Sequence, residues 1–158
     1  MGEITTLEPI LKAHPFFKDM PQPFMQLLVG CAANERYEPG QFITRSGEDA
    51  NKFYIIREGR VAIEVQPPGR GSIIIETLAD GDVLGWSWLF EPYKWNLDAH
   101  PLEAVRVISL DGACLRTKMA SDHDFGYEMF NRFAKLMLGR IKSLRNNLIE
   151  SVSQPFGG

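Results

Sequence analysis

The chain has 158 residues, which suits one domain of ordinary size but not two. Its net charge of −3 argues against a dedicated nucleic-acid-binding domain, because such domains are usually strongly basic. The apolar stretches are far shorter than the ~20 residues that span a bilayer, so we expect no membrane segment. The cysteines, Cys31 and Cys114, form no CxxC pair and no disulfide framework, which favours small apolar packing roles and a reducing cytoplasm.

Residues 4–33 are expected to form helices. Their apolar side chains recur at helical spacing, but several prolines interrupt the pattern. Proline inside a helix removes a backbone hydrogen bond, so we expect short helices joined by a tight connection. In that connection, Phe16 and Phe17 are the expected core anchors.

Between residues 34 and 84 the sequence changes to short apolar runs separated by turns rich in glycine and proline. Short strands with turns every ~8–12 residues are typical of a sandwich, roll or barrel. Three consecutive isoleucines at 73–75 predict a strand that is buried on both faces or strongly twisted. The expected strands are Gln41–Thr44, Phe53–Arg57, Val61–Val65, Ser72–Leu78, Val83–Leu84 and Ala104–Leu110.

Helix returns after residue 111. We expect a short helix at about Ala113–Ala120 and a long helix that begins near Asp122, whose side chain suits an N-cap. Apolar residues of the long helix follow the alternating three- and four-residue spacing of a heptad seam. The seam residues, which are the candidate dimer interface, are Phe130, Ala134, Met137, Ile141, Leu144 and Leu148.

Two interpretations of this seam are open. In one, the helix has a single wide apolar face that packs only within its own subunit. In the other, which we favour, Met129, Phe133 and Leu136 dock on the β-region and the seam pairs with a second copy, because a long exposed seam favours aggregation. The basic side chains are then expected on a solvated flank of the dimer seam: Arg132, Lys135, Arg140, Lys142 and Arg145.

A specific order of glycines and apolar residues runs from position 36 to the last expected strand. It reads RYEPGQFI at 36–43, SGE at 46–48, FYIIREGRV at 53–61 and LADGDVLG at 78–85. This order resembles the cyclic nucleotide-binding domain of the catabolite-activator type, and the resemblance extends over roughly residues 7–148. It implies a mainly β fold, an antiparallel, jelly-roll-like β-roll flanked by N-terminal helices and a long C-terminal helix.

We therefore expect a single domain over residues 1–150. It comprises N-terminal helices at 4–33, the β-roll at 34–111 and C-terminal helices at 112–150, followed by a frayed tail at 151–158. In the resembling family a DNA-binding domain commonly follows the long helix. Here the sequence ends shortly after the seam, so no DNA-binding module is expected and the output passes through a partner or through dimerisation.

The expected ligand site departs from the family pattern. The family's phosphate-binding cassette reads approximately F-G-E-x-A-L, and the resemblance assigns its glutamate to the ribose hydroxyl. Residues 84–89 read LGWSWL, in which Gly85 and Leu89 match the pattern. Trp86 stands at the glutamate position, and Trp88 replaces the small residue.

The phosphate contact is altered as well. The family pairs the cyclic phosphate with an arginine in a P-R-[ST]-A motif, and that position falls near Trp95 here. No arginine lies between Arg70 and Arg106, although Lys94 can supply a point charge. A phosphate buried without its cation keeps much of its desolvation cost, so we do not expect cAMP or cGMP to bind through the family's contacts.

Several interpretations of the tryptophan-rich segment are open. The rings can plug the former pocket, line a pocket remodelled for a flat or apolar ligand, or form an aromatic patch for a protein partner. A genuine cyclic-nucleotide binder with altered contacts is a further alternative. Asp98 is expected to cap a turn, or else to hold Lys94 or His100. The candidate ligand-binding residues are Gly85, Trp86, Ser87, Trp88, Leu89, Lys94, Trp95 and Asp98.

The sequence offers no enzyme signature. His14, His100 and His123 lack metal-ligand spacing, and we find no nucleophile paired with a base. We therefore expect a non-enzymatic regulatory or sensor domain that forms a cytoplasmic homodimer. A structural protein-interaction module is the main alternative.

Overall fold

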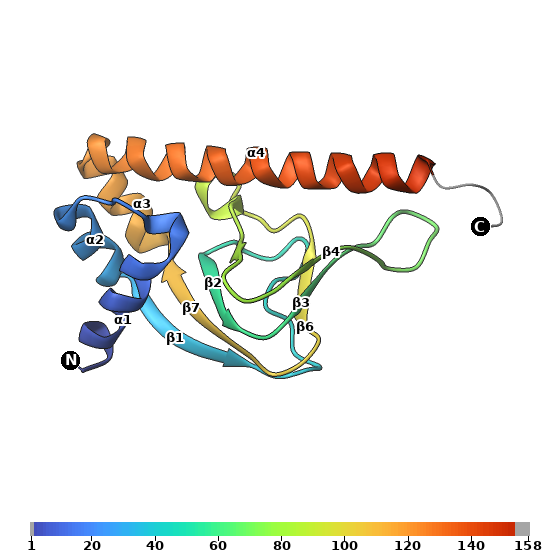
Figure 1. The fold of residues 1–158 in the computed structure, drawn as a ribbon, viewed down its shortest axis with the longest axis horizontal. Coiled ribbons are helices and arrows are strands. Elements are labelled where there is room, and N and C mark those ends of the chain that lie inside the picture. Colours follow the sequence, from blue (N-terminus) through green and yellow to red (C-terminus); the bar gives the residue numbers. More distant parts are fainter. Residues whose placement is uncertain (1, 154–158) are drawn as a thin grey trace.

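Two antiparallel sheets form the centre of the protein in the computed structural model, which describes residues 2–153 (Figure 1). The strand order is β1-β7-β2-β5 in one sheet and β4-β3-β6 in the other. This arrangement confirms the expected β-roll with flanking helices. The strands are β1 (Ala32–Tyr37), β2 (Lys52–Glu58), β3 (Val61–Val65), β4 (Ile73–Leu78), β5 (Val83–Leu84), β6 (Asp98–Pro101) and β7 (Val105–Asp111).

The two inner strands of the four-stranded sheet, β7 and β2, are largely buried on both faces. Successive side chains of a strand point to opposite faces, and the continuous apolar run in β2 uses both. Phe53 and Ile55 belong to an outer core shared with the helices, whereas Tyr54 and Ile56 belong to an inner core between the two sheets. The sheet therefore separates two hydrophobic cores, and the tryptophans are divided between them.

Helices cover the outer core (Figure 1). Phe17 is buried in the connection between α1 and α2 and Phe16 packs beside it, as predicted. The N-cap prediction for the long helix is confirmed, because the Asp122 carboxylate accepts a hydrogen bond from the backbone N–H of Phe125 (3.1 Å). The helical elements are α1 (Gly2–Ala13), η1 (Pro15–Phe17), α2 (Gln22–Val29), η2 (Ser87–Leu89), α3 (Gly112–Ser121) and α4 (His123–Ser153).

The strand predictions miss one edge strand of each sheet and include one strand that does not form. The expected strand Gln41–Thr44 is wrong, since Thr44 makes only an isolated bridge with Ala99. Strands β1 and β6 were not predicted, and both lie at a sheet edge. Edge strands need no continuous apolar run, and β6 even ends in a proline, which edge positions tolerate.

The three isoleucines of β4 are not buried. Ile73, Ile74 and Ile75 are 40%, 53% and 37% exposed, so the prediction of a strand buried on both faces is wrong. The reason is again an edge position, because β4 pairs only with β3 in its sheet. The loop between β3 and β4 projects beyond the roll (Figure 1).

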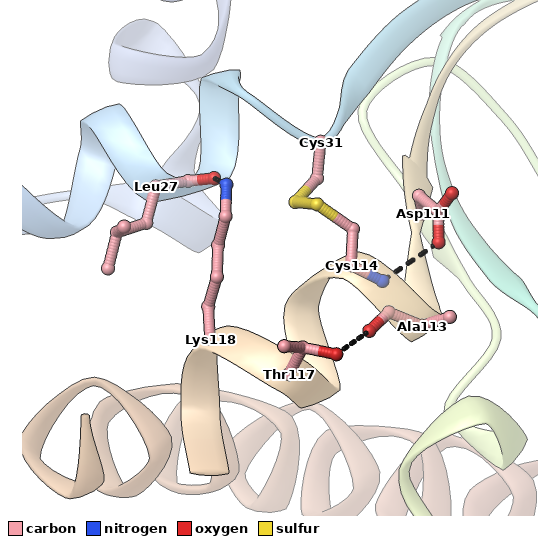
Figure 2. Close-up of a disulfide and its surroundings, with 7 residues drawn as sticks. All are labelled: Leu27, Cys31, Asp111, Ala113, Cys114, Thr117 and Lys118. Atoms are coloured by element: carbon pink, nitrogen blue, oxygen red, sulfur yellow. Dashed lines mark hydrogen bonds between the residues drawn. A yellow bond between two sulfur atoms is a disulfide. The ribbon is translucent and has the colours of Figure 1, made fainter. Parts of the chain in front are cut away.

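The two cysteines form a disulfide, which corrects the expectation of two unpaired packing residues (Figure 2). Cys31 follows α2 and Cys114 lies in the first turn of α3. The backbone N–H of Asp111 donates to the carbonyl of Cys31 (2.9 Å), and Lys118 Nζ donates to the carbonyl of Leu27 (2.8 Å). The fold thus brings segments together that are far apart in the sequence. Because the cysteines are paired, they no longer argue for a reducing compartment.

Helix α4 runs along the length of the molecule (Figure 1). Met129 and Phe133 are buried against the roll and Leu136 packs beside them, which confirms the predicted docking row. The helix continues through Ser153, into the segment expected to be a frayed tail, and residues 154–158 lie outside the described part. Within residues 2–153, no helix is long and apolar enough to cross a membrane.

Candidate ligand pocket

A cavity of about 190 Å³ lies between the roll and α4. Its walls come from β3 and β4, from residues 84–87, from residues 95–97 and from α4. Four of the eight residues predicted as ligand contacts border it. They are Gly85, Trp86, Ser87 and Trp95.

Trp95 fills the inner core beside the cassette glycine. Its side chain is only 6% exposed, and a Cβ placed on Gly85 would lie 2.6 Å from the Trp95 ring. Gly85 also has φ +103°, a conformation that side chains disfavour, so this position requires glycine on two counts. The backbone of Trp95 is held by hydrogen bonds to Gly47 and Glu48. The ring is therefore a fixed part of the pocket wall.

Trp88 points the other way, into the outer core. It is fully buried, and its ring stacks on Phe53 with centroids 5.2 Å apart and meets Phe133 of α4 edge-on at 5.5 Å. Arg116 of α3 donates to the Trp88 carbonyl (2.6 Å), which fixes η2 against that helix. Within residues 2–153, Trp88 Nε1 has no hydrogen-bond partner. Trp88 is an anchor between the cassette and α4 rather than part of the pocket wall.

Trp86 lies between these two environments. It is half-buried, packs against the edge of the outer core and lines the cavity. The three tryptophans therefore differ: Trp88 fills the outer core, Trp95 fills the inner core, and Trp86 borders the remaining space. Since Trp88 and Trp95 are both buried, the three rings do not form a single exposed patch.

The remaining polar candidates lie outside the cavity wall. Lys94 forms an exposed ion pair with Asp49. Asp98 accepts a hydrogen bond from the backbone N–H of Ser46 (2.8 Å), which is the expected turn-capping role. His100 pairs with Glu64 rather than with Asp98. Leu89 is buried and lines a different hollow beside α3 and α4.

Two charged residues of the pocket were missed by the sequence analysis. Arg140 of α4 and Glu76 of β4 both line the cavity, and Arg140 Nη1 lies 3.5 Å from Glu76 Oε2. The Arg140 side chain is only 14% exposed, and so is that of Arg132, which donates to the Phe16 carbonyl, so the assignment of these two residues to a solvated basic flank is wrong. A signal was present, because Leu136, Arg140 and Leu144 are spaced four residues apart and share one face of the helix.

Burial controls the electrostatics of this pair. Desolvation raises the pKa of Glu76, the Arg140 charge opposes that rise, and Asp82 adds to it. Arg140 also donates to the carbonyl of Val83, and its guanidinium carbon lies 5.7 Å from the centroid of the Trp86 ring. The cavity therefore has a largely apolar and aromatic wall that includes the polar Ser87 and Asn96, with the ion pair at its border with α4.

Comparison with known proteins identifies the family of this fold. The sequence pattern of the cyclic nucleotide-binding domain matches residues 34–122, which is more than half of the chain. The chain belongs to the cyclic nucleotide-binding domain family. The two positions that the family resemblance assigns to ribose and phosphate contacts, Trp86 and the neighbourhood of Trp95, both border the cavity.

Relatives of this cyclic nucleotide-binding domain occur within longer proteins. A CRP-like cAMP-activated global transcriptional regulator of Mycobacterium tuberculosis is 24% identical over 113 residues, covering 72% of this chain and 49% of that protein. The cGMP-dependent protein kinase 2 of Homo sapiens is 28% identical over 76 residues, covering 48% of this chain and 10% of the kinase. The chain thus spans half or less of the length of these two relatives.

A solved structure supports the fold over nearly the whole chain. The cyclic nucleotide-binding domain from Methylobacillus flagellatus matches with a TM-score of 0.78 at 13% identity, covering 97% of this chain and 86% of that one. At this identity the likeness concerns the fold alone. It agrees with a β-roll carried between N-terminal helices and a long C-terminal helix.

Proposed function

We propose that this chain is a non-enzymatic regulatory domain whose nucleotide pocket has been rebuilt, so that cAMP and cGMP do not bind through the family's usual contacts. The observation that carries the proposal is the Trp95 ring packed against Gly85. This ring leaves a cavity of about 190 Å³, whereas pockets that bury a ligand as large as a drug molecule usually measure roughly 300–1,000 Å³.

The electrostatics support the same conclusion. A cyclic phosphate needs a cation to offset its desolvation, but the cassette's own candidate, Lys94, is paired with Asp49 outside the cavity wall. The cation that does line the cavity, Arg140, belongs to α4 rather than to the cassette, and Glu76 competes for it. Trp86 also replaces the carboxylate that the resemblance assigns to the ribose. The pocket therefore offers aromatic surface where a cyclic nucleotide presents its polar groups.

The test is a calorimetric titration of the folded chain with cAMP and with cGMP. We expect no saturable heat in the parent. The double variant Trp86→Glu with Trp95→Arg restores the family's residue types, and it is expected to gain cAMP binding if its circular dichroism remains that of the parent. Saturable cAMP binding by the parent chain would overturn the proposal, whatever the variant does.

We also propose that the regulatory unit is a homodimer joined through α4. Ile141 and Leu148 of the seam are 61% and 64% exposed, and Phe130 and Ala134 are exposed as well. An apolar row of this length in water favours association, and a second copy supplies a matching row. Such a dimer would provide an output for a non-enzymatic regulatory domain.

A further inference from the structure

Arg140 reaches the cavity with hydrogen-bonding capacity to spare. A guanidinium carries five N–H donors. One donates to the Val83 carbonyl, and the Glu76 carboxylate lies 3.5 Å away, longer than an ordinary charged hydrogen bond. The side chain is largely buried, so water solvates this charge poorly. Arg140 therefore presents an incompletely paired cation at the edge of an apolar cavity.

The rest of the cavity suits a flat apolar group. Trp86 and Trp95 contribute aromatic surface, and Leu84 and Leu144 contribute aliphatic surface. The cavity holds about 190 Å³, and an apolar cavity of roughly 150 Å³ can hold benzene. One aromatic ring with a small substituent therefore fits this space.

We propose that this cavity binds a small aromatic carboxylate, with the ring beside Trp86 and Trp95 and the carboxylate paired with Arg140. A planar carboxylate matches the guanidinium fork through two parallel hydrogen bonds. A carboxylate also occupies less of the small cavity than a tetrahedral phosphate ester would. The inference rests on the proposed function, because it assigns a ligand class to the same rebuilt pocket.

Glu76 is the competitor for Arg140 in this arrangement. Its carboxylate and the nearby Asp82 oppose the approach of a second anion. Replacing Glu76 with glutamine removes that repulsion and frees the guanidinium, so ligand affinity should rise. The ion pair between Arg140 and Glu76 thus competes with the binding of an anion at Arg140.

The test titrates the full chain with benzoate and 4-hydroxybenzoate, using their uncharged amides as matched ligands. Calorimetry and tryptophan fluorescence give the dissociation constants. We expect saturable binding of at least one acid and affinity for its amide at least about tenfold weaker. Glu76→Gln should tighten acid binding by about tenfold or less.

Variants of α4 assign the charge that is responsible. Arg140→Gln should abolish the preference for the acid over the amide. Arg140→Lys keeps a charge without the fork and should weaken acid binding while keeping part of the preference. Arg145→Gln is the matched control, because Arg145 is an exposed cation on the same helix and does not line the cavity; its affinities should equal those of the parent.

Three results would overturn the inference. They are no saturable binding of either acid by the folded parent up to about 10 mM, equal affinity for acid and amide, or an unchanged preference in folded Arg140→Gln. The cyclic-nucleotide titration separates the two proposals. A parent that binds neither cAMP nor the acids refutes the aromatic-carboxylate site and leaves the proposed function standing, whereas cAMP binding refutes the proposed function itself.

Discussion

The two halves of α4 have different surroundings. The first half packs on the outer core through Phe125, Met129 and Phe133, which are fully buried. Beyond Met137 the apolar side chains are exposed, with Leu138 and Ile141 at 51% and 61%. One half therefore completes the fold of its own chain, whereas the other carries an apolar surface that residues 2–153 leave exposed. Arg140, at the start of the second half, borders the cavity.

The pocket and the proposed dimer seam share residues of one helix, α4. Leu144 belongs to the seam and also lines the cavity, where it lies one turn from Arg140. A ligand that pairs with Arg140 therefore acts on the same helical turns that would contact a second copy. The cassette contacts the first half of the same helix, because the ring of Trp88 in η2 packs against Phe133.

The largest expected effect is in the buried half. Phe133→Ala should lower the free energy of unfolding by about 3–5 kcal/mol, because it opens a space among the rings of Phe16, Phe53 and Trp88. Urea denaturation followed by circular dichroism measures the loss. Ile149→Ala, an exposed position in the second half, is the control and should stay within about 0.5 kcal/mol of the parent. Equal losses in the two variants would contradict the division of the helix.

The disulfide should give the next largest effect. Replacing Cys31 and Cys114 with serine should lower the free energy of unfolding by about 2–4 kcal/mol, because the bond restricts the unfolded chain over a long loop. Denaturation of the parent with and without reductant should reproduce this loss, and reductant should leave the double variant unchanged. If reductant leaves the free energy of unfolding of the parent unchanged, the disulfide does not stabilise the packing of α3 against α4.

How much the sequence could predict depends on whether the information is local. Strands β3 and β5 were predicted with their observed bounds, because their apolar runs are short and are closed by turns. Strands β1 and β6 carry polar side chains at sheet edges, so no local pattern marked them. The disulfide depends on the meeting of α2 with α3, which no spacing between the cysteines encodes.

The pocket shows the same limit. The departure from the family cassette was visible in the letters LGWSWL, but the destination of each ring was not. Trp86 and Trp88 stand two residues apart, and the turn of η2 sends one to the cavity and the other to the outer core. Arg140 is one of five basic residues in its helix, so composition alone did not single it out. Its four-residue spacing from Leu136 and Leu144 nevertheless places it on the face toward the roll.

The seam of the exposed half is tested by a charge. Ile141→Asp should weaken self-association by about 2 kcal/mol or more, about thirtyfold, because an unpaired carboxylate would be buried between two copies. Light scattering over a concentration series should show a dimeric parent and a monomeric variant. The circular dichroism of the variant should remain that of the parent, because this side chain is exposed within its own chain. A parent that remains monomeric at high concentration rules out the seam as a dimer interface.

The smallest expected effect lies where the two halves meet. Burial raises the pKa of Glu76 above its ordinary value, so the folded chain binds this proton more tightly than the unfolded chain does. The contribution of Glu76 to stability is therefore fullest below its ordinary pKa of about 4.5 and is lost as the pH rises through the higher folded value. In Glu76→Gln this dependence is absent. The free energy of unfolding of the variant minus that of the parent should thus increase with pH across this range, by less than about 1 kcal/mol.

Urea denaturation of both chains between pH 4 and pH 8 measures this difference, and groups shared by the two chains cancel in it. Arg140 decides the size of the change, since its charge opposes the effect of burial on Glu76. In the Arg140→Gln background, the same Glu76→Gln comparison should therefore show a larger pH dependence. If the pH dependence is instead unchanged in that background, the Arg140 charge does not act on Glu76. Glu76 would then not compete with an aromatic carboxylate for Arg140.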